Sequence, residues 1–118
     1  MIRLTKKSGR ITIDLTAIRM GQDLCVMLTG GDRPHLGVVT IAAKGMDAQT
    51  LAFGTHKERF VTEPIAQVLS QRFSGHFVIC SGIHVDQITK PEIDQVKVLS
   101  IALANDLCVQ LNERGDDQ

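Results

Sequence analysis

The chain has 118 residues, of which 43% are apolar, and its 13 basic residues balance 13 acidic ones. This length suits one domain with its own core, and the apolar content with no net charge excludes a disordered chain. The charge balance and the absence of Trp and Tyr argue against a nucleic-acid binder, which carries excess basic charge and often stacks bases on aromatic rings. We expect a single domain over 1–118, with a core from about 11 to 112 and frayed ends.

The start of the chain and its cysteines both predict a cytoplasmic protein. Residues 1–10 hold four basic residues, but they are followed by alternating polar residues rather than the apolar run of a signal peptide. No stretch approaches the ~20 apolar residues that a membrane span needs, so we expect no membrane contact. Cys25, Cys80 and Cys108 lie far apart, each inside an apolar run, and are expected to be reduced thiols in the core.

The first half of the chain predicts strands. Residues 11–17 alternate between apolar and polar side chains, which is the pattern of a half-buried strand. The apolar runs 24–29 and 36–43 are separated by a glycine-rich polar loop and indicate a hairpin. A polar loop at 44–49 and a short fourth strand at 50–53 follow. The simplest topology is a meander of antiparallel strands.

The second half of the chain predicts helices around one more strand. Helical spacing of apolar residues covers about 60–73, and the helix either starts around Phe60–Thr62 or bends at Pro64, because proline is tolerated only near the first turn. Residues 76–81 predict a buried strand. The last helix begins at Thr89, which can cap it together with Glu92 three residues later. We expect this helix to stop at Gly115, before an acidic, frayed tail.

The resulting order, β-β-β-(β)-α-β-α, predicts an α+β fold in which two helices cover one face of a mainly antiparallel sheet. The last helix has one apolar face, and further apolar residues widen it: Val98, Ile101, Ala102 and Val109. A helix that is apolar on more than one side is buried on more than one side. Together with the zero net charge, this surplus of apolar surface predicts a homodimer.

Three loops concentrate the polar residues that suit ligand chemistry. Each begins with glycine and carries a histidine with an acidic residue within three positions. Glycine lets a backbone approach a ligand closely, histidine can bind metal, transfer protons or donate to phosphate, and Arg33 and Lys57 can bind phosphate or carboxylate. The candidate binding residues are Gly30, Gly31, Asp32, Arg33, His35 and Gly37 in the first loop, His56, Lys57 and Glu58 in the second, and Gly82, His84 and Asp86 in the third.

Each loop also has an ordinary structural interpretation. Gly-Gly-Asp between strands is common turn chemistry, and residues 56–58 suit a solvated helix start. His84 suits a structural histidine whose hydrogen bonds are made within the protein, and Asp86 suits a turn or cap residue. His76 is expected to be exposed where its strand begins. The histidine spacing matches no zinc motif such as H-E-x-x-H, and we find no nucleophile grouping or phosphate-loop signature. We therefore predict neither catalytic residues nor metal ligands, and a small metal-assisted enzyme is the third alternative.

Segments 30–39, 54–58 and 82–86 together resemble the small D-subunit family of bacterial gallate and hydroxyarylic acid decarboxylases, described as a prenylated-flavin chaperone-like domain. The resemblance extends from about residue 11 to 110. The order of the predicted elements is also similar to the small α+β fold of proteasome-assembly chaperones, a likeness that concerns architecture rather than function.

The resemblance implies a non-catalytic protein that binds or delivers prenylated flavin mononucleotide (or ordinary FMN) and whose partner is a large catalytic decarboxylase subunit. Arg33, Lys57 and the glycine amides would suit the phosphate, and the loop histidines would suit the phosphate, ribityl chain or flavin edge. A flavin ring also favours an aromatic or apolar platform. The aromatic candidates are Phe53 and Phe60, and the alternatives are an apolar shelf from Leu36, Ile83 or the partner of a dimer. The alternative is an interaction subunit whose loops contact the large subunit without any flavin.

Overall fold

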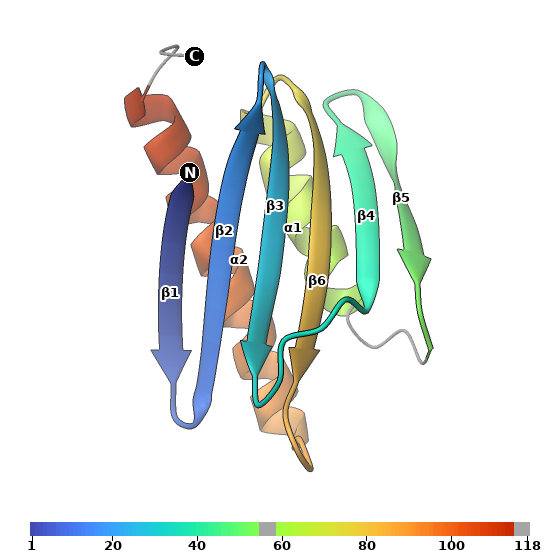
Figure 1. Ribbon diagram of the computed structural model, residues 1–118, viewed down its shortest axis with the longest axis vertical. Coiled ribbons are helices and arrows are strands. Elements are labelled where there is room, and N and C mark those ends of the chain that lie inside the picture. The colour runs from blue at the N-terminus through green and yellow to red at the C-terminus, as the bar shows by residue number, and fades with distance from the viewer. Residues whose placement is uncertain (55–58, 115–118) are drawn as a thin grey trace.

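The computed structural model describes residues 1–54 and 59–114, so the predicted second loop (His56, Lys57 and Glu58) and the predicted stop at Gly115 lie outside the described residues. One six-stranded sheet carries both helices on a single face (Figure 1). This confirms the predicted α+β class. In chain order the elements are β1 (Ile2–Ser8), β2 (Ile11–Met20), β3 (Asp23–Gly31), β4 (Val38–Ala43), β5 (Met46–Ala52), α1 (Arg59–Arg72), β6 (His76–His84) and α2 (Lys90–Arg114).

The strand order is β1-β2-β3-β6-β4-β5, so the predicted meander and the predicted hairpin between 24–29 and 36–43 are wrong. The last strand in sequence, β6, inserts between β3 and β4 and runs parallel to β3. Its residues explain this central place. Phe77 and Ile79 are buried on the helix side, while Val78 and Cys80 are half-buried on the other side. A strand that is apolar on both faces is typical of the middle of a sheet.

Residues 32–37 connect β3 to β4 and must therefore pass β6. They cross it on the face of the sheet that points away from the helices (Figure 1). Gly82 lies beneath this crossing, where a Cβ atom would overlap the carbonyl group of His35. The amide of Gly37 then donates to the carbonyl of Ser81 at 2.8 Å, which fixes the end of the crossing to β6.

The edge strands are longer than the sequence pattern indicates. Residues 2–8 form β1, which pairs with β2 and buries Ile2, whereas we expected this end to fray. Residues 46–49, predicted as a loop, belong to β5. Both strands are largely exposed, so solvent-facing polar residues interrupt the apolar alternation on which strand prediction depends.

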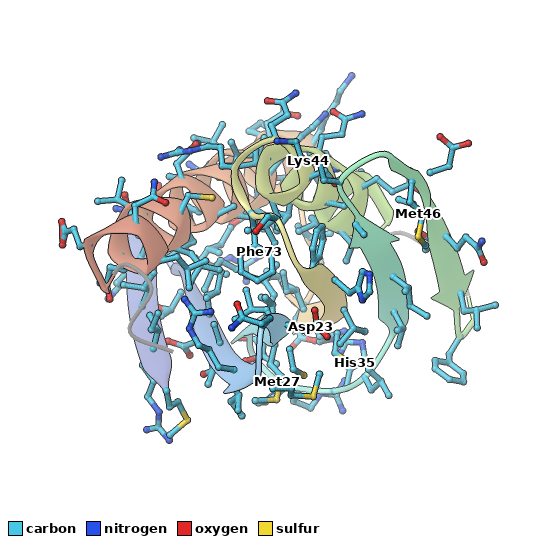
Figure 2. All side chains as sticks on the ribbon, turned by 90° about the horizontal axis from the view of Figure 1, so that it is seen from above. Asp23, Met27, His35, Lys44, Met46 and Phe73 are labelled. Atoms are coloured by element: carbon cyan, nitrogen blue, oxygen red, sulfur yellow. The ribbon has the colours of Figure 1, made fainter. Side chains whose placement is uncertain are left out.

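The core lies between the sheet and the helices, with Phe73 visible between the two layers in Figure 2. The helix α1 continues through Pro64, which lies in its second turn. The predicted cap of α2 is confirmed, because Thr89 N donates to Glu92 Oε1 at 3.0 Å and Glu92 N donates to Thr89 Oγ1 at 3.3 Å. Val98 and Val109 do not widen the buried face of α2, since both are exposed.

All three cysteines are free thiols, as predicted, but only Cys108 is in the core. Cys25 and Cys80 are half-buried on the sheet face away from the helices. Burial raises the pKa of the Cys108 thiol. Burial and the neighbouring Cys25 likewise raise the pKa of the Cys80 thiol. Both groups are therefore weak nucleophiles in the folded chain.

Candidate functional site

The candidate site lies at the end of the sheet where the parallel strands β3 and β6 finish. Gly31 and His84 are register partners at these two carboxyl ends. The N-terminal ends of α1 and α2 lie at the same end of the molecule (Figure 1). Helix N-termini carry partial positive charge and unpaired N–H groups, so this end of the molecule favours anions.

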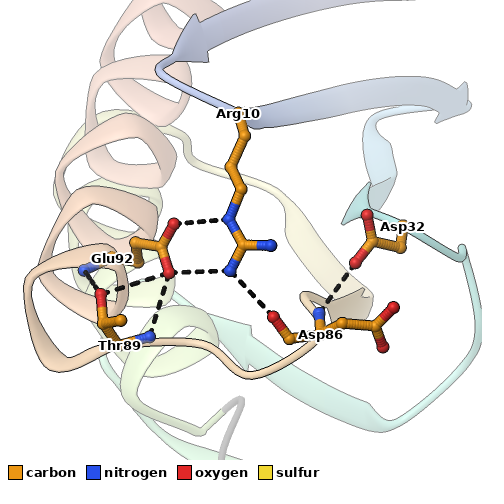
Figure 3. Close-up of polar contacts among 5 residues, drawn as sticks. All are labelled: Arg10, Asp32, Asp86, Thr89 and Glu92. Atoms are coloured by element: carbon orange, nitrogen blue, oxygen red, sulfur yellow. Dashed lines mark hydrogen bonds and ion pairs between the residues drawn. The ribbon is translucent and has the colours of Figure 1, made fainter.

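The predicted first and third loops meet at this end. The amide of Asp32 donates to the carbonyl of His84 at 2.5 Å, and the amide of Asp86 donates to Asp32 Oδ2 at 2.8 Å (Figure 3). Gly31 has a φ of 75° and sits where a Cβ would overlap the His84 carbonyl. Glycine is thus required at position 31 for both reasons, and the two loops form one connected structure.

Side chains from both loops form a polar group that we call the rim cluster: Arg33, His35, His84 and Asp86. His84 Nε2 lies 2.8 Å from Asp86 Oδ1 and 3.3 Å from Arg33 Nη2. His35 Nδ1 lies 3.5 Å from the Arg33 carbonyl. Nε2 can donate to Asp86 only when it carries a proton and can accept from Arg33 only when it does not. The two contacts of His84 therefore compete.

A pocket of about 540 Å³ lies beside the rim cluster, between β6 and the starts of α1 and α2. His35 and His84 line it on the rim side. Its other walls are mostly apolar and consist of Phe53, Phe60, Val61, Ile83, Val85, Gln87, Ile88, Ile93 and Val96. The volume and the apolar lining with a few polar groups are typical of sites for small molecules and cofactors.

The predicted glycines shape the chain rather than line the pocket. A Cβ atom at position 30 would overlap the carbonyl of Thr12. The carbonyl of Gly37 accepts a hydrogen bond from the amide of Phe53 at 2.8 Å. Gly31 and Gly82 allow the close backbone passages described above. Among the predicted platform residues, Phe53, Phe60 and Ile83 do line the pocket, whereas Leu36 is exposed.

Sequence reasoning missed Arg10, which lies in the turn between β1 and β2. Its guanidinium donates to both carboxylate oxygens of Glu92, at 2.7 and 2.9 Å, and to the Asp86 carbonyl at 2.8 Å (Figure 3). The hydrogen bond from Arg10, followed by that from the Thr89 amide, lowers the pKa of Glu92 to about 2. The same pairing raises the pKa of Arg10. Arg10 thereby ties the third loop to the start of α2.

Residues 1–54 and 59–114 contain neither a cluster of metal ligands nor a membrane-spanning helix. In this part of the chain, no three His, Cys, Asp or Glu side chains are placed to hold a metal ion together. No helix in the same residues is long and apolar enough to cross a membrane.

The fold and the site define a two-layer α+β domain with a mostly apolar pocket at the carboxyl ends of its parallel strand pair. Residues 7–112 match the family model described as the prenylated flavin chaperone LpdD-like domain, and the chain belongs to this family. The resemblance found in the sequence is thereby confirmed.

Two individual proteins illustrate the likeness. The chain is 37% identical over 79 residues to Protein LpdD of Lactiplantibacillus plantarum, a match that covers 63% of this chain and 58% of that protein. The structure of the present chain is similar to one chain in the crystal structure of a chaperone complex for yeast 20S proteasome assembly, with a TM-score of 0.62 and 13% sequence identity. The match covers 92% of this chain and 94% of that one. At this identity the second likeness shows the fold alone, and it confirms the predicted architecture.

Proposed function

We propose that this chain is a non-catalytic accessory protein of a prenylated-flavin-dependent aromatic acid decarboxylase, and that its pocket holds prenylated flavin mononucleotide. The observation that carries the proposal is the mostly apolar pocket bordered by the rim cluster, in a chain of the prenylated flavin chaperone family. The flavin would supply the decarboxylation chemistry only once it is bound in the large catalytic subunit.

The pocket walls suit the ring system of the cofactor. Val61 and Val96 are buried at the starts of the two helices, and Ile83 adds a half-buried side chain from β6. Burying apolar surface contributes roughly 25 cal/mol per Å², so a flavin that carries an additional hydrocarbon ring gains more here than an unmodified one. Phe53 is 64% exposed and offers a ring that a bound flavin would cover.

The rim cluster suits the phosphate. Arg33 is exposed and can present two parallel N–H groups to an oxyanion. A phosphate at this position would replace Asp86 as the acceptor for His84, and the nearby helix N-termini would favour its charge. In this arrangement Arg33 and His84 bind the anion, while the apolar walls shield the ring from water.

Titration of the purified full chain with prenylated FMN, followed by flavin fluorescence, tests the binding. We expect saturable binding that weakens at least several-fold in Arg33→Ala and in Phe53→Ala. Both side chains are exposed, so neither truncation should change the fold. Matched controls are Lys44→Ala, a cation in the turn between β4 and β5, and Val98→Ala, an exposed apolar residue of α2.

Absence of binding by the wild type, or unchanged affinity in both rim and pocket variants, would contradict the site. Delivery needs a second experiment, in which the loaded chain is mixed with the flavin-free large subunit. Decarboxylase activity should appear faster than with free cofactor at the same concentration. If the chain binds the flavin but never accelerates loading, it stores the cofactor and does not deliver it.

A further inference from the structure

Asp86 holds the contact on His84 that the proposed function assigns to the phosphate of the flavin. Its Oδ1 atom lies 2.8 Å from His84 Nε2. A carboxylate and a phosphate are both oxyanions that accept from a protonated histidine nitrogen, and Nε2 carries at most one proton. The two groups therefore compete for the same donor, and one of the competitors is part of the chain itself.

The backbone of Asp86 is fixed, whereas its side chain is free to turn. The Asp86 carbonyl accepts from Arg10 Nη2 at 2.8 Å, and the Asp86 amide donates to Asp32 Oδ2 at 2.8 Å (Figure 3). The side chain is 71% exposed, and its carboxylate points away from both backbone contacts in Figure 3. A change of side-chain rotamer can therefore move the carboxylate off His84 while the third loop stays in place.

The neighbouring cations have different partners. Arg10 forms its ion pair with Glu92, both of whose carboxylate oxygens accept from the guanidinium. Arg33 Nη2 lies 3.3 Å from the same His84 nitrogen that Asp86 contacts, so the cation proposed to bind the phosphate lies beside this pair. An anion held by Arg33 and His84 would be close to the negative charge of Asp86 for as long as that side chain stays in place, and like charges repel.

We infer that Asp86 is an internal counter-ion that lowers the affinity of the site for the phosphate group of the flavin. The inference rests on the proposed function and adds a residue that opposes binding. When the phosphate binds, it displaces the Asp86 carboxylate from His84, and when the phosphate leaves, the carboxylate returns. His84 thus exchanges one oxyanion for another, and no covalent bond changes. The exchange favours release, because the histidine regains an acceptor as the cofactor departs.

Titration of the full chain with prenylated FMN, and with the same flavin after phosphatase treatment, tests the inference. Asp86→Asn keeps the size of the side chain and removes its charge. We expect this variant to bind prenylated FMN about two- to fivefold more tightly than wild type, the range that corresponds to one exposed charge pair. The dephosphorylated flavin should bind both chains equally. The matched control is Asp94→Asn, which removes the same charge from an exposed position near the start of α2 and should leave both affinities unchanged.

Unchanged or weaker binding of prenylated FMN by Asp86→Asn overturns the inference. So does equal tightening by Asp94→Asn, or equal tightening for the dephosphorylated flavin, because the effect would then not be local to the phosphate. A wild type that binds neither flavin contradicts the proposed function instead, and inorganic phosphate then decides the inference. The NMR signals of the His84 ring should shift at a lower phosphate concentration in Asp86→Asn than in wild type. The same phosphate dependence in both chains, or no response in either, overturns it.

Discussion

The carbonyl group of His35 lies directly against the α-carbon of Gly82, although the two residues belong to different predicted loops. The contact exists because the connection between β3 and β4 passes over β6, and only a residue without a side chain leaves room for it. It also sets the position of the candidate site. The crossing holds His35 and Arg33 next to His84, and these residues form most of the rim cluster.

Replacing Gly82 with alanine should therefore destabilise the fold and disturb the site. Overpacking typically costs about 1–3 kcal/mol, and this position is at the upper end because the obstacle is backbone. The midpoint of urea unfolding should fall accordingly. Flavin affinity should fall as well, because segment 32–37 must move to make room.

The control for this prediction is Gly45→Ala, in the turn between β4 and β5. Gly45 has a φ of 81°, and no atom lies within 4 Å of the place that a Cβ would occupy. Its substitution therefore costs only the strain of a left-handed backbone, about 1–2 kcal/mol. The turn between β4 and β5 lies at the end of the sheet opposite to the carboxyl ends of β3 and β6 (Figure 1), where the pocket is. Gly45→Ala should lower stability without changing flavin affinity. Equal affinity loss in both variants would show that Gly82 acts only through global stability.

The ion pair between Arg10 and Glu92 predicts a specific dependence of stability on pH. The pKa of Glu92 is held at about 2 in the folded chain, below the ordinary value of 4.5. A carboxylate with a lowered pKa stabilises the fold above the unfolded pKa and loses this contribution as pH falls through the folded one. In wild type, the contribution should therefore be complete at pH 7 and disappear between about pH 4.5 and 2.

Glu92→Gln should be less stable than wild type at neutral pH, and the difference should shrink across the same acidic interval. Urea unfolding at a series of pH values measures it. The comparison is Asp106→Asn, which removes the 3.1 Å ion pair of Lys6 and Asp106, whose side chains are 37% and 49% exposed. Exposed pairs contribute little, so this variant should resemble wild type. A constant gap between Glu92→Gln and wild type down to pH 2 would contradict the prediction.

The sequence predicts those features that depend on local pattern. The alternation over 11–17 appears as β2, and the Thr89–Glu92 spacing appears as the cap of α2. Pairing between distant strands has no such signal, so the place of β6 beside β3 was missed. The edge strand β1 was missed because Lys6 occupies an inward-facing position at which the alternation would place an apolar side chain.

The candidate site was predicted only in part, because some of its residues have a local sequence pattern and others are brought together only by the fold. His35 and His84 belong to recognisable glycine-rich loops, and these loops do meet. The pocket walls at Val61 and Val96 look like ordinary core positions, because helical spacing does not reveal that a helix start borders a cavity. Arg10 lies 82 positions before its partner Glu92, and only the folded chain brings them together.

The cap of α2 offers a third prediction. Thr89→Ala removes the hydroxyl that accepts from the Glu92 amide and should cost about 1 kcal/mol. Thr89→Ser keeps that oxygen and should retain most of the stability. Urea unfolding of the three chains measures the order wild type, serine variant, alanine variant. A serine variant as unstable as the alanine variant would show that the methyl group of Thr89, and not its hydroxyl, carries the effect.

The buried hydroxyl of Ser100 gives the last prediction, in which a substitution should not harm the protein. Ser100 is fully buried in α2, and its Oγ has no hydrogen-bond partner among the described residues. An unpaired buried hydroxyl costs about 1–3 kcal/mol of desolvation, and alanine is the better helix former. Ser100→Ala should therefore match or exceed wild type in the midpoint of urea unfolding.

Thr40→Val is the contrast. Thr40 Oγ1 lies 2.9 Å from Thr50 Oγ1, and losing this hydrogen bond should cost about 1 kcal/mol. Clear destabilisation by Ser100→Ala would mean that its hydroxyl is hydrogen-bonded in solution.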